Sequence, residues 1–165
     1  MEFLDDGITT GTGPPHLDAL ARGAWVGLTA KHSRADLIRS ILEGVCYSQR
    51  DCLEIIVGMG APVSLARLSG GGAASPFWHQ LFADIFGKRV VTLATKEGSA
   101  YGAALLALVG TGEYASAREL CSQAIQESAA KEPDAADAAL YNRAYKIYRS
   151  LYPALKETYQ PISQV

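Results

Sequence analysis

The spacing of apolar residues predicts helices that alternate with short strands along most of the chain. The clearest run follows Ser33, where apolar residues return every three to four positions and keep one face of a helix apolar. Ser33 and Asp36 fit a capping box at its start, while Gly58, Gly60 and Pro62 end it. The pattern predicts a helix of about 24 residues, long enough to cross a whole sheet.

Shorter apolar runs and turn residues predict the other elements. Strands are expected over residues 24–28, 63–68 and 90–93. Helices are expected over residues 76–86, 98–109, 113–129 and 134–152, the last of them capped by Asp134. Residues 1–22 are interrupted by glycine and proline and are expected to be irregular.

The order of these elements favours an α/β domain. After residue 33 the chain reads helix, strand, helix, strand, helix, which is typical of at least partly parallel strand pairing. The alanines and glycines of residues 98–109 should let that helix approach the sheet closely. In the last helix, tyrosines at 141, 145, 148 and 152 share one face, which predicts a seam that packs the helix onto the domain.

Composition narrows the class of protein. The 165 residues suffice for one domain, and 48% hydrophobic with 19% charged residues argues against disorder. A net charge of −2 leaves no basic surplus for nucleic acid, and no apolar run reaches the roughly 18 residues that span a bilayer. Three cysteines without a Cys-x-x-Cys pair, and only three histidines, indicate a reduced, cytoplasmic protein without a zinc site.

A glycine-rich turn is the strongest candidate site. Gly70, Gly71 and Gly72 join an expected strand to the helix start at Ser75 and Pro76. Glycines let the backbone come close to a ligand, and free N–H groups at a helix start favour phosphate. A tight turn without a ligand is the alternative.

Two known phosphate motifs can be compared with this turn. It lacks the Gly-Lys-Ser/Thr of a P-loop. The dinucleotide pattern Gly-x-Gly-x-x-Gly fits at Gly70 and Gly72, but Ser75 stands where the third glycine belongs. Glu97 follows the next strand, near where a ribose-binding acid would fall. A Rossmann-like dinucleotide-binding module therefore stays open as an alternative.

Three stretches, in order, resemble the FGGY carbohydrate kinases. Residues 23–28 with 36–43 resemble the second signature of that family, and residues 69–80 with Ala83 and Asp84 resemble its adenosine motif. Residues 97–104 resemble its final glycine/alanine helix. Residues 14–18, 21–23 and 152–155 are similar to the xylulokinase branch. The resemblance covers about residue 11 to residue 158.

The resemblance implies a ribonuclease-H-like fold of the actin and hexokinase type, in which two domains close over a cleft. Residues 23–165, after the irregular segment 1–22, would be the later part of the second, ATP-binding domain, incomplete at its N-terminal strands. The implied reaction transfers the γ-phosphoryl group of Mg²⁺-ATP to a sugar hydroxyl, with D-xylulose as the implied sugar. In this family the catalytic Asp and the first phosphate loop lie ahead of the matched region. The chain alone is therefore expected to be inactive and to hold no catalytic or metal-binding residue.

The implied ATP-binding residues are Gly70, Gly71, Gly72, Ala73 and Ser75. In the resembled motif the backbone at Gly71 and Gly72 meets the adenosine and its α-phosphate. For Ser75 we favour a role as helix cap over direct contact with adenine.

Neighbouring residues are interpreted structurally. Trp78 and Phe82 are four apart on one helix and are expected to pack in the core rather than stack on adenine. His79 points away from that pair and is expected to be exposed. A structural role or a solvent-facing position is expected for Asp84 rather than binding of Mg²⁺. His16 and Asp18 are expected to make loop contacts, because two ligands do not form a metal site.

A third hypothesis is a non-catalytic remnant or interaction module. The absence of the first domain supports it, as does the segment Gly11–Pro14, where the family usually has Gly-Glu-Arg. So small a sheet should leave open edges and part of the long helix's apolar face uncovered, which favours a homo-oligomer or a partner chain. Alternatively, residues 1–21 fold back over the gap and give a monomer.

Overall fold

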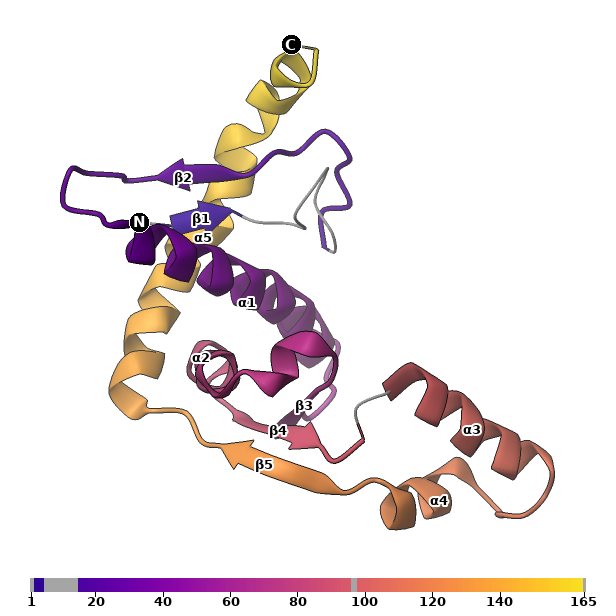
Figure 1. Cartoon of the computed structure of the whole chain (residues 1–165). Coiled ribbons are helices and arrows are strands. Elements are labelled where there is room, and N and C mark those ends of the chain that lie inside the picture. Colours follow the sequence, from indigo (N-terminus) through magenta and orange to yellow (C-terminus); the bar gives the residue numbers. More distant parts are fainter. Residues whose placement is uncertain (1, 5–14, 96–97, 165) are drawn as a thin grey trace. The chain divides into compact units, whose positions relative to one another are not determined.

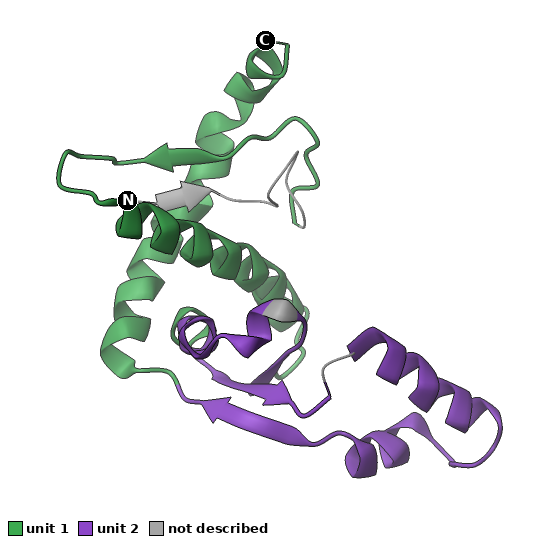
Figure 2. Ribbon diagram, in the orientation of Figure 1, with its two compact units in different colours: residues 1–63, 84–87, 133–165 green, residues 64–83, 88–132 purple. Residues whose placement is uncertain are grey.

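The computed structural model of the chain describes residues 2–4, 15–95 and 98–164 (Figure 1). The elements in chain order are β1 (Glu2–Leu4), β2 (Ala24–Val26), α1 (Arg34–Gly58), β3 (Leu65–Leu68), the 3₁₀ turn η1 (Gly71–Ala74), α2 (Pro76–Phe86), β4 (Arg89–Leu93), α3 (Gly98–Gly110), α4 (Ala117–Ala124), β5 (Glu127–Lys131) and α5 (Ala135–Ile162). They form two compact units (Figure 2). Unit 1 holds residues 1–63, 84–87 and 133–165, and unit 2 holds residues 64–83 and 88–132.

Unit 1 contains a two-stranded antiparallel sheet of β1 and β2, in which Phe3 lies opposite Trp25. The prediction that residues 1–22 are irregular is therefore wrong for Glu2–Leu4. Three residues are too few to show the alternation that marks a strand, and the partner strand begins twenty positions later. The expected strand 24–28 is confirmed in its first three residues.

Helix α1 has the start and end that the sequence predicts. The Ser33 side chain accepts the backbone N–H of Asp36, and Asp36 accepts the backbone N–H of Ser33 at 2.8 Å, so both halves of the capping box are present. The chain leaves the helix after Gly58, and Gly60 follows with φ +85°, a conformation that favours glycine. Ile38, Ile55 and Ile56 stay about half exposed, so the predicted apolar face is only partly covered in this chain.

Helix α5 packs on α1 through the predicted tyrosine seam. Tyr141, Tyr145, Tyr148 and Tyr152 are all buried. Tyr47 of α1 lies among three of these rings, with its ring centroid 5.0 Å from that of Tyr148 and 5.9 Å from that of Tyr145. The seam is therefore confirmed.

The predicted end of the last helix at residue 152 is wrong, because α5 continues through Pro153 to Ile162. A proline inside a helix removes one backbone hydrogen bond. The extra turns keep Tyr159, two turns beyond Tyr152, at 2% exposure. Burial of that large ring offsets the lost bond, which local sequence rules do not anticipate.

Unit 2 is built on a three-stranded sheet in the order β3-β4-β5. Strands β3 and β4 are parallel and α2 connects them, so the predicted α/β class and parallel pairing are confirmed. Helix α2 has the predicted bounds. Val90 and Val91 of β4 are fully buried, because this strand is the middle one.

Strand β5 corrects the prediction of one helix over residues 113–129. Helix α4 ends at Ala124, and β5 then pairs antiparallel with β4. Ser128 Oγ lies 2.9 Å from Thr92 Oγ1 across this pair. The local sequence Glu-Ser-Ala-Ala-Lys favours a helix, but pairing with the free edge of β4 outweighs that propensity.

Helix α3 packs beside α4 rather than along the sheet (Figure 1). The Tyr101 hydroxyl donates to the Ala124 carbonyl at 2.9 Å. Only Leu105 is buried in α3, and a Cβ added at Gly102 would meet nothing within 4 Å. The expected close approach of this helix to the sheet is therefore wrong. In the described ranges no helix is both long and apolar enough to cross a membrane.

Candidate functional site

The glycine turn lies in unit 2, between the end of β3 and the start of α2. Gly70 has φ 86° and ψ −174°, and residues 71–74 then form the 3₁₀ turn η1. Within the turn the Ala73 N–H donates to the Gly70 carbonyl at 3.2 Å, and the Ser75 N–H donates to the Gly72 carbonyl at 3.1 Å. These two N–H groups are therefore occupied inside the turn, and a ligand has to use others.

Ser75 caps α2, as the sequence predicts. Its Oγ accepts the backbone N–H of Trp78 at 3.4 Å, and its carbonyl accepts the N–H of His79 at 2.9 Å. Pro76 follows at the first helical position, where a missing N–H costs least.

Gly72 lies directly against the ring of Trp78. A Cβ added at Gly72 would lie 2.4 Å from Trp78 Cζ3 and 2.6 Å from Cε3. Behind this contact Trp78 stacks on Phe82, with ring centroids 5.9 Å apart. Phe82 is buried, as its predicted packing role requires, whereas Trp78 is half-buried.

The start of α3 lies beside the same turn. A Cβ added at Gly98 would meet the Ser69 side chain at 3.5 Å, which is ordinary van der Waals contact. Two of the three stretches singled out in the sequence, residues 69–80 and 97–104, therefore meet in unit 2. Glu97 lies outside the described residues, as does Gly11–Pro14.

Helix α2 carries two buried polar residues, His79 in unit 2 and Asp84 in unit 1. His79 is 3% exposed and its Nε2 lies 2.9 Å from the Val90 carbonyl, so the predicted exposure is wrong. Residues 81–85 of α2 are buried as well, so the covered face of the helix is wider than an argument from Trp78 and Phe82 alone indicates. Asp84, in unit 1, is 4% exposed and accepts the Asp134 N–H at 2.8 Å, which confirms its structural role.

His16 and Asp18 make the predicted loop contacts with α5. The His16 ring stacks on Tyr152 with centroids 3.7 Å apart, and the Tyr152 hydroxyl donates to Asp18 at 2.9 Å. Burial lowers the pKa of His16. Across the described ranges, no group of three or more His, Cys, Asp and Glu side chains could hold a metal ion.

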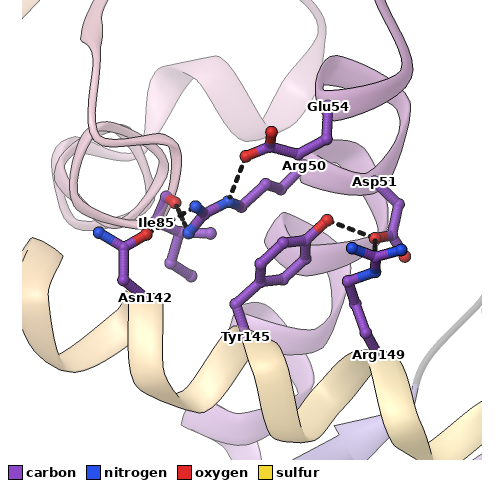
Figure 3. A network of polar contacts seen from close by, with 7 residues as sticks. All are labelled: Arg50, Asp51, Glu54, Ile85, Asn142, Tyr145 and Arg149. Atoms are coloured by element: carbon purple, nitrogen blue, oxygen red, sulfur yellow. Dashed lines mark hydrogen bonds and ion pairs between the residues drawn. The ribbon is translucent and has the colours of Figure 1, made fainter. Parts of the chain in front are cut away.

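Unit 1 contains a charged cluster that sequence reasoning missed, formed by Arg50, Asp51, Asn142, Tyr145 and Arg149 and named here the Arg50–Asp51 network (Figure 3). The Arg50 guanidinium donates to the Ile85 carbonyl at 2.8 Å and to Asn142 Oδ1 at 2.6 Å. It also lies over the Tyr145 ring, 4.2 Å from the centroid. The network holds α1 and α5 together by side-chain contacts.

Asp51 is the acidic member of this network. It is 8% exposed and accepts a short hydrogen bond from the Tyr145 hydroxyl, while Arg149 Nε lies 3.9 Å away. Burial raises the pKa of Asp51, and the bond from Tyr145 opposes that rise. Burial and the same bond raise the pKa of Tyr145. The only signal in the sequence is that residues 50 and 51 fall three and four positions after Tyr47, on the buried face.

Comparisons with known proteins agree with the family resemblance. The sequence model described as "FGGY family of carbohydrate kinases, C-terminal domain" matches residues 3–111. A xylulose kinase from Bacillus subtilis is 36% identical over 143 residues, which is 87% of this chain and 29% of that protein. A glycerol kinase from Coxiella burnetii is 40% identical over 111 residues, 67% of this chain and 22% of that protein.

A solved structure agrees with the fold over nearly the whole chain. A ligand-bound xylulose kinase from Lactobacillus acidophilus superposes with a TM-score of 0.89 at 27% identity, covering 98% of this chain and 32% of that one. The chain thus spans about 30% of the length of the relatives that it matches. Its fold is the mixed α/β, actin-type ATPase fold of the C-terminal domain in this family.

Proposed function

The chain belongs to the FGGY family of carbohydrate kinases, and on that premise we propose that it is the adenosine-binding part of an ATP-dependent sugar kinase. The proposed ligand contacts are the backbone of Gly70, Gly71 and Gly72. Ala73, whose N–H bonds within the turn, would pack against the ligand, and Ser75 caps the helix behind them. The observation that carries this proposal is the Gly70–Ala74 turn, placed at the end of a parallel strand and followed by a capped helix. Ligands of open α/β sheets bind at that end of the strands.

The chemistry supplied by this chain is positioning. Phosphoryl transfer depends mainly on placing the reactants and stabilising charge, and the glycine turn offers backbone groups but no acid or base. Mg²⁺ would enter with ATP, bound to its phosphates, and would neutralise their developing charge. The catalytic base is proposed to come from a part of the kinase outside this chain.

D-Xylulose is the proposed sugar. Xylulose kinases match 87% of the chain, including residues beyond the glycine turn and α3, whereas the glycerol kinase matches 67%. We also propose a cytoplasmic location, because none of the three cysteines forms a disulfide. A coupled assay of ADP release with xylulose and Mg²⁺-ATP should show no sugar-dependent turnover by the chain alone. Turnover above background would show that a catalytic base lies within it.

A partner is proposed for the exposed apolar side chains of unit 1. Ile38, Ile55 and Ile56 are 47–51% exposed, and Met59 is 81% exposed. In unit 2, β3 is an edge strand that pairs with β4 alone among the strands of the described residues. Such surfaces favour association, with a second copy or with the remainder of a kinase. Sedimentation at micromolar concentration should show species larger than a monomer, and a cooperative monomer would contradict the proposal.

Calorimetry with ATP and NAD tests the nucleotide proposal against the Rossmann alternative. ATP or ADP should bind and NAD should bind more weakly or not at all. Equal or tighter binding of NAD would favour the dinucleotide-binding module. Binding of neither nucleotide would favour the non-catalytic interaction module.

A matched pair of variants locates the site. Ala74 is exposed at the end of η1, so Ala74→Asp and Ala74→Lys place opposite charges at the turn without changing its glycines. The Asp variant should weaken ATP binding several-fold and the Lys variant should preserve or strengthen it. Equal affinities would place the phosphates elsewhere. Gly72→Asp is a poorer probe, because its side chain would displace Trp78 whether or not a ligand is bound.

A further inference from the structure

Gly70 and Gly72 occupy the same turn for different physical reasons. Gly70 has φ +86°, which favours glycine, yet a Cβ added there would meet nothing within 4 Å. Gly72 lies outside the left-handed region, so its backbone conformation is open to other residues. Its Cβ would instead fall 2.4 Å from the Trp78 ring. Conformation therefore requires glycine at 70, whereas space requires it at 72.

Trp78 is anchored to the turn at both ends. Its backbone N–H donates to Ser75 Oγ, and the six-membered edge of its indole, at Cζ3 and Cε3, lies against Gly72. The ring is held from behind by its stack on Phe82. A large, rigid side chain fixed in this way leaves the Gly72 backbone little room to move.

The indole nitrogen adds a second observation. In an indole, Nε1 lies on the edge opposite Cε3 and Cζ3, so it points away from Gly72. Among the described residues it is buried without a hydrogen-bond partner. Burying an unpaired donor is unfavourable, and leucine or phenylalanine would fill space without it. Simple packing therefore does not account for tryptophan here.

We propose that Trp78 is the positioning residue of the glycine turn: its ring sets the path of the backbone at Gly72 and thereby the shape of the loop that receives the nucleotide phosphates. The identity of the ligand rests on the proposed function, whereas the contact between Trp78 and Gly72 does not. The two parts are therefore tested separately.

A double-mutant cycle tests the contact. Gly72→Ala, Trp78→Leu and the double variant are compared by their free energies of unfolding in denaturant. Gly72→Ala should shift the unfolding midpoint strongly when Trp78 is present and little in the Trp78→Leu background, because leucine vacates the space. An equal shift in both backgrounds would overturn the proposal, since Gly72 would then be required for another reason.

Calorimetric titration with ATP tests the positioning role. Trp78→Leu should weaken ATP binding by about tenfold or more, because small displacements of a positioning loop have large effects. Val91→Ala is the matched control: it removes buried apolar atoms from β4 of the same unit, outside the contacts among Gly72, Trp78 and Phe82, and should change affinity less than about twofold. Similar losses in both variants, or none in Trp78→Leu, would overturn the positioning role.

Fluorinated tryptophan gives a readout that a purely structural role would not move. The chain has two tryptophans, and Trp25 belongs to unit 1. With 7-fluorotryptophan at both positions, the fluorine sits on Cζ2, away from the edge that contacts Gly72. ATP should shift the ¹⁹F resonance of Trp78 and leave that of Trp25, and the Trp25→Phe variant assigns the two resonances. Bound ATP with an unmoved Trp78 resonance would overturn the proposal. If the wild-type chain binds no ATP, the proposed function fails, and so does the role of Trp78 in nucleotide binding. The double-mutant cycle of Gly72 and Trp78 still decides whether Trp78 fixes the turn.

Discussion

The Arg50–Asp51 network of unit 1 is formed by side chains, whereas the glycine turn of unit 2 is formed mainly by backbone. The network joins long charged and aromatic side chains from residues almost one hundred positions apart. The turn is a continuous run of small residues whose shape is set by the backbone and by one neighbouring ring. The network borders a cavity of about 710 Å³, but its charged side chains already bond one another. A backbone turn of small residues instead leaves N–H groups that a ligand can use. Under the proposed function, the first region stabilises the fold and the second binds the nucleotide.

The largest expected effect comes from removing the buried cation of the network. Arg50→Ala should lower the free energy of unfolding by about 3 kcal/mol, because it leaves the Ile85 carbonyl and Asn142 without their donor. Denaturation followed by circular dichroism measures this loss. If the variant does not fold, Arg50→Lys keeps the charge without the planar fork and should still be clearly destabilised.

Arg149→Ala is the control for this prediction. Its side chain is 66% exposed and its Nε lies 3.9 Å from Asp51, so the loss should stay below about 0.5 kcal/mol. Equal losses in the two variants would show that the burial of Arg50 adds nothing to stability. The network would then not be the stabilising region of the two.

Removal of one hydroxyl should have a smaller effect. Tyr145→Phe leaves the buried Asp51 carboxyl without a donor and should cost about 1–2 kcal/mol of unfolding free energy. Tyr101→Phe in unit 2 removes a bond to the neutral Ala124 carbonyl and should cost about 1 kcal/mol or less. Denaturant unfolding of the two variants measures both losses of free energy. A larger loss in Tyr101→Phe than in Tyr145→Phe would contradict the ranking.

Two glycines with nearly the same positive φ separate stability from binding. Gly70 has φ +86° and Gly60, at the end of α1, has φ +85°, and neither has an atom within 4 Å of an added Cβ. Alanine at either position should cost about 1 kcal/mol. Only Gly70→Ala should also weaken ATP binding in calorimetry. Equal effects on affinity would mean that the turn has no special part in it.

The smallest expected effect is a dependence of the unfolding free energy on pH. The pKa of Asp51 is raised by burial above its ordinary 3.8, so its contribution to stability is fully present below about pH 3.8 and is lost as pH rises through the raised value. Asp51→Asn lacks this ionisation. The unfolding free energy of Asp51→Asn minus that of the wild type should therefore increase as pH rises above about 3.8, and level off once Asp51 is ionised in the folded state. If this difference in unfolding free energy instead fell as pH rises, the pKa of Asp51 would be lowered in the folded state rather than raised.

The sequence predicted the features that depend on neighbouring residues and missed those that depend on contacts between distant segments. The capping box of α1, the bounds of α2 and the tyrosine seam follow from spacings within one segment, and so does the glycine turn. Strand β5 and the extension of α5 depend on pairing and burial against other segments, which override local propensity. The Trp78 contact with Gly72 was missed because spacing places a side chain on a face but does not say what it touches.

Chemical-shift perturbation of backbone amides on adding ATP tests the division between the two regions most directly. We expect the largest changes in amide chemical shift at residues 69–75 and at Gly98. The amides of residues 50–51 and 141–149 should keep their chemical shifts. ATP that shifts residues 50–51 and 141–149 and leaves residues 69–75 in place would contradict it. The nucleotide would then bind at the charged network, and the glycine turn would be structural.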